Sequence, residues 1–416
     1  MAQLGSFALL LALALSGYAF FAGGLALWRA AVPAPAGPGY DPQIDLTRRR
    51  DGGAAAAQGP DRLRETARRA GIAIWLTVTV AVIALLVAAF TNDFSVAYVA
   101  HHSNITLPAA YKFAALWSGQ EGSLLFWSWL LATYGLVLRL RYKTDRRLFA
   151  YAGVILAGVQ FFFQLLLVFA APPFALIAGT PPADGNGLNP LLQYPEMVIH
   201  PPMLYLGYVG FAVPFAFALG ALIMRYPGEK WIHITRRWTM VTWLFLTCGI
   251  FLGMHWAYAV LGWGGYWGWD PVENASVMPW LTGTAFLHSV MMQEKRGMLK
   301  VWNVWLIFCT FMLSIFGTTL TRGGLVSSVH AFAQSSIGEW FLGAAGWSGE
   351  PWKSVPYYVP GFLTIVFAAC LYFFIRNRDH LKSENRLESL VSRESSFLFN
   401  NLLLLAACFV ILWGTL

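Results

Sequence analysis

Ten or so long apolar runs dominate this sequence, and they limit the chain to folds in which helices cross a membrane. Each run has about 17–25 residues, enough to span the hydrocarbon core of a bilayer as a helix. The runs cover 6–28, 72–90, 121–138, 148–171, 202–224, 238–257, 274–292, 301–320, 357–375 and 397–416. The whole chain is 57% hydrophobic and only 12% charged. We therefore predict an all-α fold, a polytopic bundle of about ten spans forming a single membrane domain over 1–416.

The basic residues fall almost entirely in alternate loops. Of 28 Lys and Arg residues, the exceptions are Lys112, Arg322 and Lys353. Because basic loops stay in the cytoplasm, this bias places the N-terminus on the outer side of the membrane, in the periplasm or its equivalent. The same rule predicts that loops 91–120, 172–201, 258–273 and 321–356 are periplasmic.

The loop at 29–70 is predicted to be cytoplasmic, basic and partly disordered, since it is rich in Pro, Gly and Ala around an Arg triplet at 48–50. Its charge suits contact with anionic lipid. The net charge of +8 does not predict nucleic-acid binding, because the basic residues flank the spans. The chain contains no phosphate-binding G-x-x-x-x-G-K-[ST] motif and no C-x-x-C pair, so neither ATP hydrolysis nor thiol redox chemistry is indicated.

The segment 263–280, WGGYWGWDPVENASVMPW, differs from every other part of the chain. It is rich in aromatic residues separated by glycines, which let the backbone approach a partner closely. Aromatic faces of this kind suit a flat, apolar ligand such as a porphyrin. A belt of interfacial aromatic residues is the alternative interpretation. Asp270, Pro271 and Glu273 also read as the N-cap, N1 and N3 positions of a helix, so Asp270 is expected to cap it.

Histidines provide the main candidates for metal binding. His200 and His330 are both predicted on the side of the aromatic segment, where two imidazoles could supply both axial ligands of a haem iron. His200 precedes two prolines that we interpret as a helix start. The alternative is that each histidine is a hydrogen-bonded interface residue.

Two further residues carry a functional interpretation. His288 lies inside an apolar run, where an ionisable residue indicates a haem ligand or a proton relay; a hydrogen bond to a neighbouring helix is the alternative. Arg322 could pair with a haem propionate, or it could be an interfacial arginine whose stem lies in the bilayer.

Several segments together resemble one known family. The stretch 262–281 is similar to the tryptophan-rich WWD signature of haem-handling proteins, and its Asp-Pro-Val-Glu-Asn-Ala-Ser continuation resembles that of the CcmF family of cytochrome c-type biogenesis proteins. Other segments agree in family order: FSVAYV at 94–99, HSN at 102–104, GQEGSL at 119–124, HPPMLYLGY at 200–208, TRGG at 321–324 and VHAFA at 329–333.

The resemblance implies a haem lyase component of cytochrome c maturation. Such a protein takes haem from the periplasmic chaperone CcmE and joins it to the C-x-x-C-H motif of apocytochrome c. It implies that His200 and His330 ligate the incoming haem and that His288 ligates a b-type haem. The WWD platform at 258–280 would comprise Trp263, Tyr266, Trp267, Trp269 and Asp270. Implied partners are CcmE, apocytochrome c, the subunits CcmH and CcmI, quinol and membrane lipid.

Members of this family usually run longer, so we expect this chain to be a fragment or half of a split protein, with the second b-haem ligand beyond Leu416. Three other functions remain open: a haem transporter that moves haem outward without bond chemistry, a b-type electron carrier, and a relative dedicated to maturation of multihaem nitrite reductase.

Overall fold

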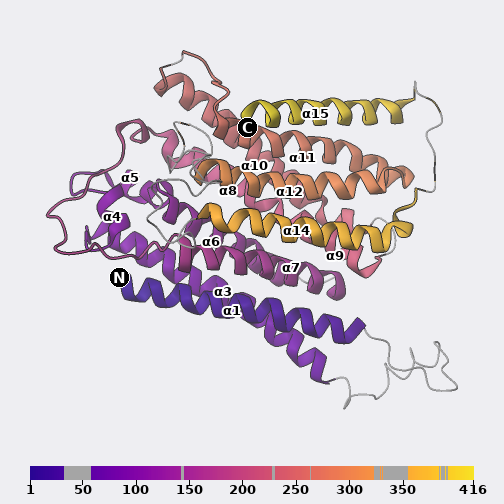
Figure 1. Cartoon of the computed structure of the whole chain (residues 1–416), viewed down its shortest axis with the longest axis horizontal. Coiled ribbons are helices and arrows are strands. Elements are labelled where there is room, and N and C mark those ends of the chain that lie inside the picture. The colour runs from indigo at the N-terminus through magenta and orange to yellow at the C-terminus, as the bar shows by residue number, and fades with distance from the viewer. Residues whose placement is uncertain are drawn as a thin grey trace, which may run out of the picture.

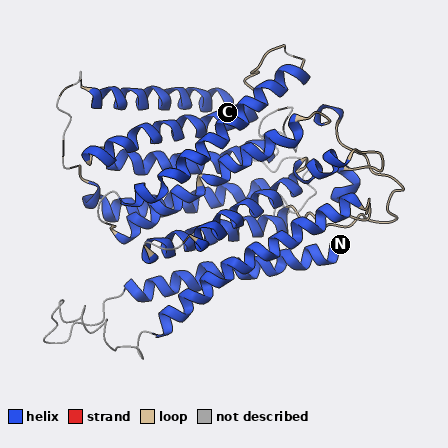
Figure 2. Ribbon diagram, turned by 180° about the vertical axis from the view of Figure 1, so that it is seen from behind, coloured by secondary structure: helices blue, strands red, loops and turns tan. Residues whose placement is uncertain are grey.

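The computed structural model of this chain describes residues 1–31, 58–141, 145–226, 230–262, 264–322, 328, 330, 355–383, 385, 389 and 392–416. Trp263 and Lys353 therefore lie outside the described residues. Within the described ranges the chain is a bundle of helices (Figure 1), and its β structure is one isolated bridge between Val96 and Leu176. The all-α prediction is confirmed, since Figure 2 shows blue helices joined by tan loops and no red strand among the described residues.

The long helices are α1 (Ala2–Ala31), α3 (Gln58–Phe90), α6 (Gln120–Leu140), α7 (Arg146–Leu165), α8 (Glu196–Gly210), α9 (Ala212–Met224), α10 (Lys230–Val260), α11 (Pro271–Arg296), α12 (Lys300–Arg322), α14 (Val355–Asn377) and α15 (Arg393–Thr415). Two short helices, α4 (Ala97–His102) and α5 (Ala109–Ala114), lie in the connection between α3 and α6. Among the described residues, nine helical stretches are long and apolar enough to cross a membrane. The chain is thus a multi-pass membrane protein.

Helix α11 corresponds to the predicted span 274–292, which is not among these nine stretches because it is less apolar than they are. It nevertheless packs inside the bundle against α10, α12 and α15. Its start confirms the prediction from sequence: Asp270 is the N-cap, Pro271 occupies the first turn, and Glu273 completes a capping box. Helix α11 is therefore fixed at its N-terminus by its own sequence.

The start of α8 differs from the prediction. The helix begins at Glu196, so Pro201 and Pro202 lie inside it and do not start it. A proline inside a helix leaves the carbonyl four residues earlier without its N–H partner. Here the indole N–H of Trp117 donates to the carbonyl of Met197, at 2.9 Å, and so satisfies the group that Pro201 cannot reach. This hydrogen bond allows α8 to begin early enough to include His200.

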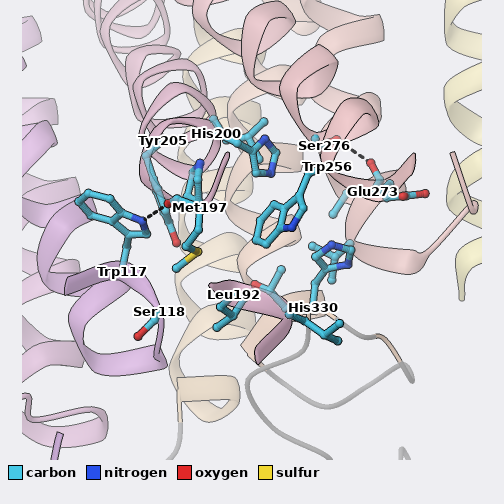
Figure 3. A pocket seen from close by; sticks show the side chains of 18 of the residues that line it. Trp117, Ser118, Leu192, Met197, His200, Tyr205, Trp256, Glu273, Ser276 and His330 are labelled. Carbon is cyan, nitrogen blue, oxygen red and sulfur yellow. Dashed lines mark hydrogen bonds between the residues drawn. The ribbon is translucent and has the colours of Figure 1, made fainter. Parts of the chain in front are cut away.

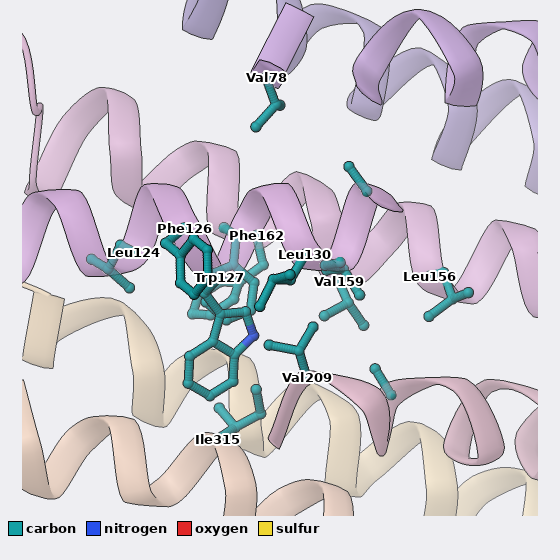
Figure 4. Packing of buried hydrophobic residues seen from close by; sticks show 14 of the residues in the cluster. Val78, Leu124, Phe126, Trp127, Leu130, Leu156, Val159, Phe162, Val209 and Ile315 are labelled. Atoms are coloured by element: carbon teal, nitrogen blue, oxygen red, sulfur yellow. The ribbon is translucent and has the colours of Figure 1, made fainter. Parts of the chain in front are cut away.

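A single apolar core joins most of the helices. In Figure 4, Trp127 of α6 lies among side chains from neighbouring helices, including Val209 of α8 and Ile315 of α12. Trp127 also stacks on Phe163 of α7, with ring centroids 5.2 Å apart. This packing joins α6, α7, α8 and α12 beside the candidate site, whose wall includes Trp127.

The other end of the bundle carries basic residues that link separate helices. The guanidinium of Arg225 donates to Asn377 Oδ1 at 2.7 Å, and Arg296 pairs with Glu394 at 2.8 Å. These contacts bring the described ends of α9 and α14, and those of α11 and α15, together. The side of the membrane that this end faces stays a prediction.

Candidate functional site

A cavity of about 480 Å³ lies at the end of the bundle opposite those basic residues. It is bounded by the N-terminal parts of α6, α8 and α11 and by the C-terminal parts of α10 and α12. In Figure 3, His200 of α8, Trp256 of α10 and His330 lie around one shared space. Four histidines line the cavity: His101, His102, His200 and His330. The structure therefore brings together the two histidines that the sequence predicted as a pair.

His200 is held by the backbone of the neighbouring helix. Its Nδ1 atom lies 2.7 Å from the carbonyl oxygen of Gly249 on α10. A carbonyl only accepts, so Nδ1 carries the proton and donates it, which leaves Nε2 as the unprotonated nitrogen of the neutral ring. The ring also meets Trp256 edge-to-face, with centroids 5.7 Å apart.

Glycines allow α8 and α10 to approach closely enough for this contact. A Cβ atom on Gly253 would lie 2.6 Å from Cε1 of His200, and one on Gly249 would lie 2.8 Å from the backbone nitrogen of Leu204. Small residues let membrane helices pack backbone to backbone in this way. The position of the His200 ring thus depends on two glycines one turn apart on α10.

His330 is held by the residue that caps α11. Its Nδ1 lies 3.1 Å from Oδ2 of Asp270, and the same oxygen accepts from the Ser328 hydroxyl at 2.6 Å and from the Val272 backbone at 3.0 Å. Burial opposes ionisation of the Asp270 carboxyl, but the hydrogen bonds from His330 and Ser328 outweigh it and lower its pKa below the usual value. Asp270 is therefore an anion beside the imidazole.

The two histidines share one arrangement. Each has its Nδ1 occupied by an oxygen acceptor from another element, and each lines the cavity. Metal-binding histidines usually have one ring nitrogen held in this way, which orients the ring and leaves the other nitrogen for the metal. The neutral tautomers of both rings therefore have an Nε2 lone pair available for a metal.

The aromatic segment divides between the cavity and the surface. Trp267 lines the cavity, and its indole N–H is buried without a hydrogen-bond partner among the described residues. Tyr266 instead stacks on Tyr258, with centroids 4.5 Å apart, and is 53% exposed. Trp269 is 63% exposed, and its backbone has a positive φ of 55° that turns the chain toward the cap at Asp270. Of the predicted platform, Trp267 is thus the described aromatic residue on the cavity wall.

Arg322 ends α12 and is buried in the cavity wall. Its guanidinium donates to the Ser123 hydroxyl at 2.8 Å and to the Tyr205 hydroxyl at 3.2 Å. Arg322 therefore belongs to a helix end, whereas the sequence placed it at the start of the 321–356 loop. A buried guanidinium in a cavity wall is suited to bind a carboxylate.

The sequence analysis did not predict that the connection between α3 and α6 forms part of the cavity wall. His102 lines the cavity and stacks on Tyr98, with ring centroids 4.4 Å apart, and Trp117 lines it next to Met197. Gly119 permits this arrangement, since a Cβ there would lie 2.4 Å from Nε2 of His102. Tyr98, His102 and Gly119 belong to sequence segments already noted for their family resemblance, whereas Trp117 does not, and no local pattern predicted that His102 and Trp117 line the same cavity as His200.

His288 is not among the residues that line this cavity. It lies 18 residues after Asp270, about 27 Å along a helix at 1.5 Å per residue. Its Nδ1 is 2.7 Å from the side-chain nitrogen of Asn400 on α15, and its ring meets Phe397. Any haem at His288 would thus be separate from a ligand bound between His200 and His330.

Comparison with known proteins identifies the family. The model of the family described as "Cytochrome C assembly protein" matches residues 117–325. A cytochrome c-type biogenesis protein CcmF from Haemophilus influenzae is 40% identical over 366 residues, covering 87% of this chain and 53% of the relative. The CcmF protein of Escherichia coli is 40% identical over 365 residues, covering 86% and 53%. The chain belongs to the CcmF family.

A solved structure and a second named branch add to this result. The structure titled "Cytochrome c Heme Lyase CcmF" matches with a TM-score of 0.71 and 30% identity, covering 100% of this chain and 56% of that one. A biogenesis protein named NrfE from Haemophilus influenzae is 46% identical over 265 residues, covering 62% of this chain and 41% of the relative. This CcmF-family chain thus spans about half the length of the curated relatives that it matches.

Proposed function

We propose that this chain acts in cytochrome c maturation as a haem lyase component. In this proposal it receives haem from the chaperone CcmE and promotes covalent attachment to the C-x-x-C-H motif of apocytochrome c. The observation that carries the proposal is the pair formed by His200 and His330. Both line one cavity, and both have Nδ1 bound to an acceptor that leaves Nε2 for an iron atom.

The cavity residues fit haem as the substrate. The volume of about 480 Å³ lies within the range of about 300–1,000 Å³ that is usual for small-molecule sites. Trp256 and Trp267 supply aromatic surface for the porphyrin. The unpartnered N–H of Trp267 and the guanidinium of Arg322 could donate to the two propionates.

In the proposed reaction this chain positions the haem and the apocytochrome, and it supplies no reacting group of its own. A cysteine sulfur of the apocytochrome adds to one carbon of a haem vinyl group, and a proton adds to the other carbon, so no oxidant is consumed. The thiolate is the reactive form of the cysteine. The two histidines would hold the iron and the aromatic wall would orient the ring, until the histidine of the apocytochrome replaces one of them.

The remaining expectations follow from the family and stay proposals. The cavity would face the periplasm, and the chain would lie in the inner membrane with CcmH and CcmI as neighbours and quinol as a source of electrons. A b-type haem would be held by His288 together with residues supplied outside the described part of the chain. The described residues place Asn400 beside His288, so Asn400 would have to move or to turn its amide.

The test is an optical spectrum of the purified chain after coexpression with CcmE. We expect wild type to carry low-spin haem, and we expect His200→Ala and His330→Ala to lose it, while His233→Ala keeps it because His233 is an exposed residue paired with Glu294. Retention of haem in both cavity variants, with loss in His288→Ala, would favour the b-type carrier. Normal haem content in all of these variants would refute the ligand assignment.

A second function has one specific observation in its favour, the 46% identity to the protein named NrfE. The chain could serve a multihaem nitrite reductase in place of the general set of c-type cytochromes. The discriminating measurement is covalent haem attachment to a monohaem and to a multihaem apocytochrome in parallel. Maturation of the multihaem substrate alone would favour the dedicated relative.

A further inference from the structure

A second cavity, of about 340 Å³, lies at the basic end of the bundle. Residues of α1, α3, α6 and α7 form most of its wall. Figure 1 shows α1, α3 and α7 running along the same side of the molecule, and α1 packs against both of the others. The cavity lies where α1 and α3 pack on the bundle and is separate from the histidine cavity at the other end.

The charged residues of this wall are mainly arginines. Arg64, Arg68, Arg139 and Arg146 line the cavity, and Glu65 is the acidic residue among them. Glu65 accepts two hydrogen bonds from Arg68, at 2.8 and 2.7 Å, and one from Arg69 at 2.9 Å. These ion pairs with Arg68 and Arg69 stabilise Glu65 as a carboxylate. The wall thus carries three more positive charges than negative ones.

Glycines make room for one of these arginines between two helices. A Cβ atom on Gly71 of α3 would lie 2.2 Å from Cζ of Arg139, and one on Gly135 of α6 would lie 2.6 Å from its Nη1. The guanidinium of Arg139 therefore rests against α3 in space that any side chain at position 71 would fill. Arg139 is therefore packed between helices and is not a mobile surface arginine.

Apolar groups complete the same wall. Leu138, Val154 and Phe217 line the cavity beside the arginines. Gly153 also lines it, and a Cβ atom placed there would meet no atom within 4 Å. The cavity therefore offers both cationic and apolar surface to one ligand, with open space at Gly153.

We propose that this cavity binds the phosphate headgroup of an anionic phospholipid. Arginine forks match phosphate oxygens in pairs and carry a charge at every relevant pH. The apolar part of the wall fits the upper acyl chain or the glycerol region, which a free phosphate ion does not have. The predicted cytoplasmic position of this end places it in the leaflet where anionic lipids concentrate and where basic pockets between helices bind them.

The test is native mass spectrometry of the detergent-purified chain with added phosphatidylglycerol or with phosphatidylcholine of the same acyl chains. We expect phosphatidylglycerol to bind at least about five-fold more tightly, because both lipids carry the phosphate but the choline of phosphatidylcholine adds a cation that the arginine-lined wall repels. Arg146→Gln and Gly153→Leu should each weaken this binding about five-fold, the first by removing a cation and the second by filling the cavity. The matched controls are Arg147→Gln, an exposed neighbour outside the cavity wall, and Gly361→Leu, where a Cβ also meets nothing within 4 Å.

Three results would overturn the proposal. Equal binding of the two lipids would show that the headgroup charge is not recognised. Equal loss of binding in Arg147→Gln and Arg146→Gln would indicate general attraction to a basic surface. The third result is full displacement of phosphatidylglycerol by millimolar inorganic phosphate, with unchanged lipid binding in Gly153→Leu. It would show that the arginines bind a free oxyanion and that the cavity is not a lipid site. None of these measurements depends on haem, so they are independent of the function proposed for the other cavity.

Discussion

His330 Nδ1 lies 3.1 Å from Oδ2 of Asp270, the oxygen that also accepts from the backbone of Val272 at the start of α11. One carboxylate thus starts a helix and orients an imidazole. An anionic acceptor raises the basicity of the opposite ring nitrogen, and residues in this position commonly change metal affinity 10–100-fold when they are replaced.

Asp270→Asn should separate the two roles of this residue. Asparagine is as good an N-cap as aspartate, so we expect the free energy of unfolding to change by less than about 0.5 kcal/mol. Haem affinity should fall about tenfold, because a neutral amide is a weaker acceptor for the His330 N–H. Haem titration and thermal unfolding of the same samples measure both effects. Unchanged affinity with a large loss of stability would show that Asp270 acts through the cap alone.

Gly253→Ala should displace His200. The new methyl group would lie 2.6 Å from the His200 ring, so the ring or the helix must shift, at a cost of about 1–3 kcal/mol. We expect haem binding between His200 and His330 to be lost at a detergent and temperature at which the variant is still folded. Gly262→Ala is the control, since a Cβ there meets nothing within 4 Å. Equal haem content in the two variants would contradict the close approach of α8 and α10.

Trp117→Phe should destabilise the start of α8. Phenylalanine keeps the ring but leaves the Met197 carbonyl without the donor that replaces the missing N–H of Pro201. An unsatisfied buried carbonyl costs about 1–3 kcal/mol, which a lower thermal midpoint would report. Trp413→Phe is the control, because that indole is 78% exposed. The account fails if both substitutions lower the midpoint equally.

The stability of the α3–α6 connection should depend on pH through His102. Burial lowers the pKa of His102, and its hydrogen bond to the Tyr98 carbonyl only partly opposes this effect. In the unfolded chain the pKa is about 6.5, so the unfolded state takes up a proton first as pH falls. Stability is therefore complete above pH about 6.5 and decreases below it, by at most about 1.4 kcal/mol per pH unit. His102→Gln should flatten the curve of thermal midpoint against pH, whereas His101→Gln should change its slope much less, because the charge of His101 is the last of the causes that shift the pKa of His102.

Most of the fold could be predicted because each span carries its own signal. Apolar length predicted the helices, and the Asp-Pro-Val-Glu sequence predicted the capping box of α11, since both are local. The start of α8 could not be predicted, because it depends on a hydrogen bond between Trp117 and Met197 across 80 residues of sequence. Sequence patterns within α8 contain no information about that donor.

The candidate site could be predicted in its residue types but not in its contacts. His200 and His330 were identified from their position and family resemblance, and they do share one cavity. Tyr266 and Trp269 have the same composition signal as Trp267, yet they lie on the surface. Tyr266 stacks on Tyr258 and the backbone of Trp269 has a positive φ, and the order of residues alone reveals neither.

The hydrogen-bond acceptors of His200 and His330 differ in how a point mutation can affect them. The acceptor for His200 is a main-chain oxygen of Gly249, so no side chain supplies it, but a Cβ at position 249 would press on Leu204 and push α8 away. The acceptor for His330 is a side chain, and a single base change in its codon can remove it. Substitutions would therefore change the orientation of His200 only by changing the spacing between α8 and α10. A substitution of Asp270 could change the orientation of His330 without altering that spacing.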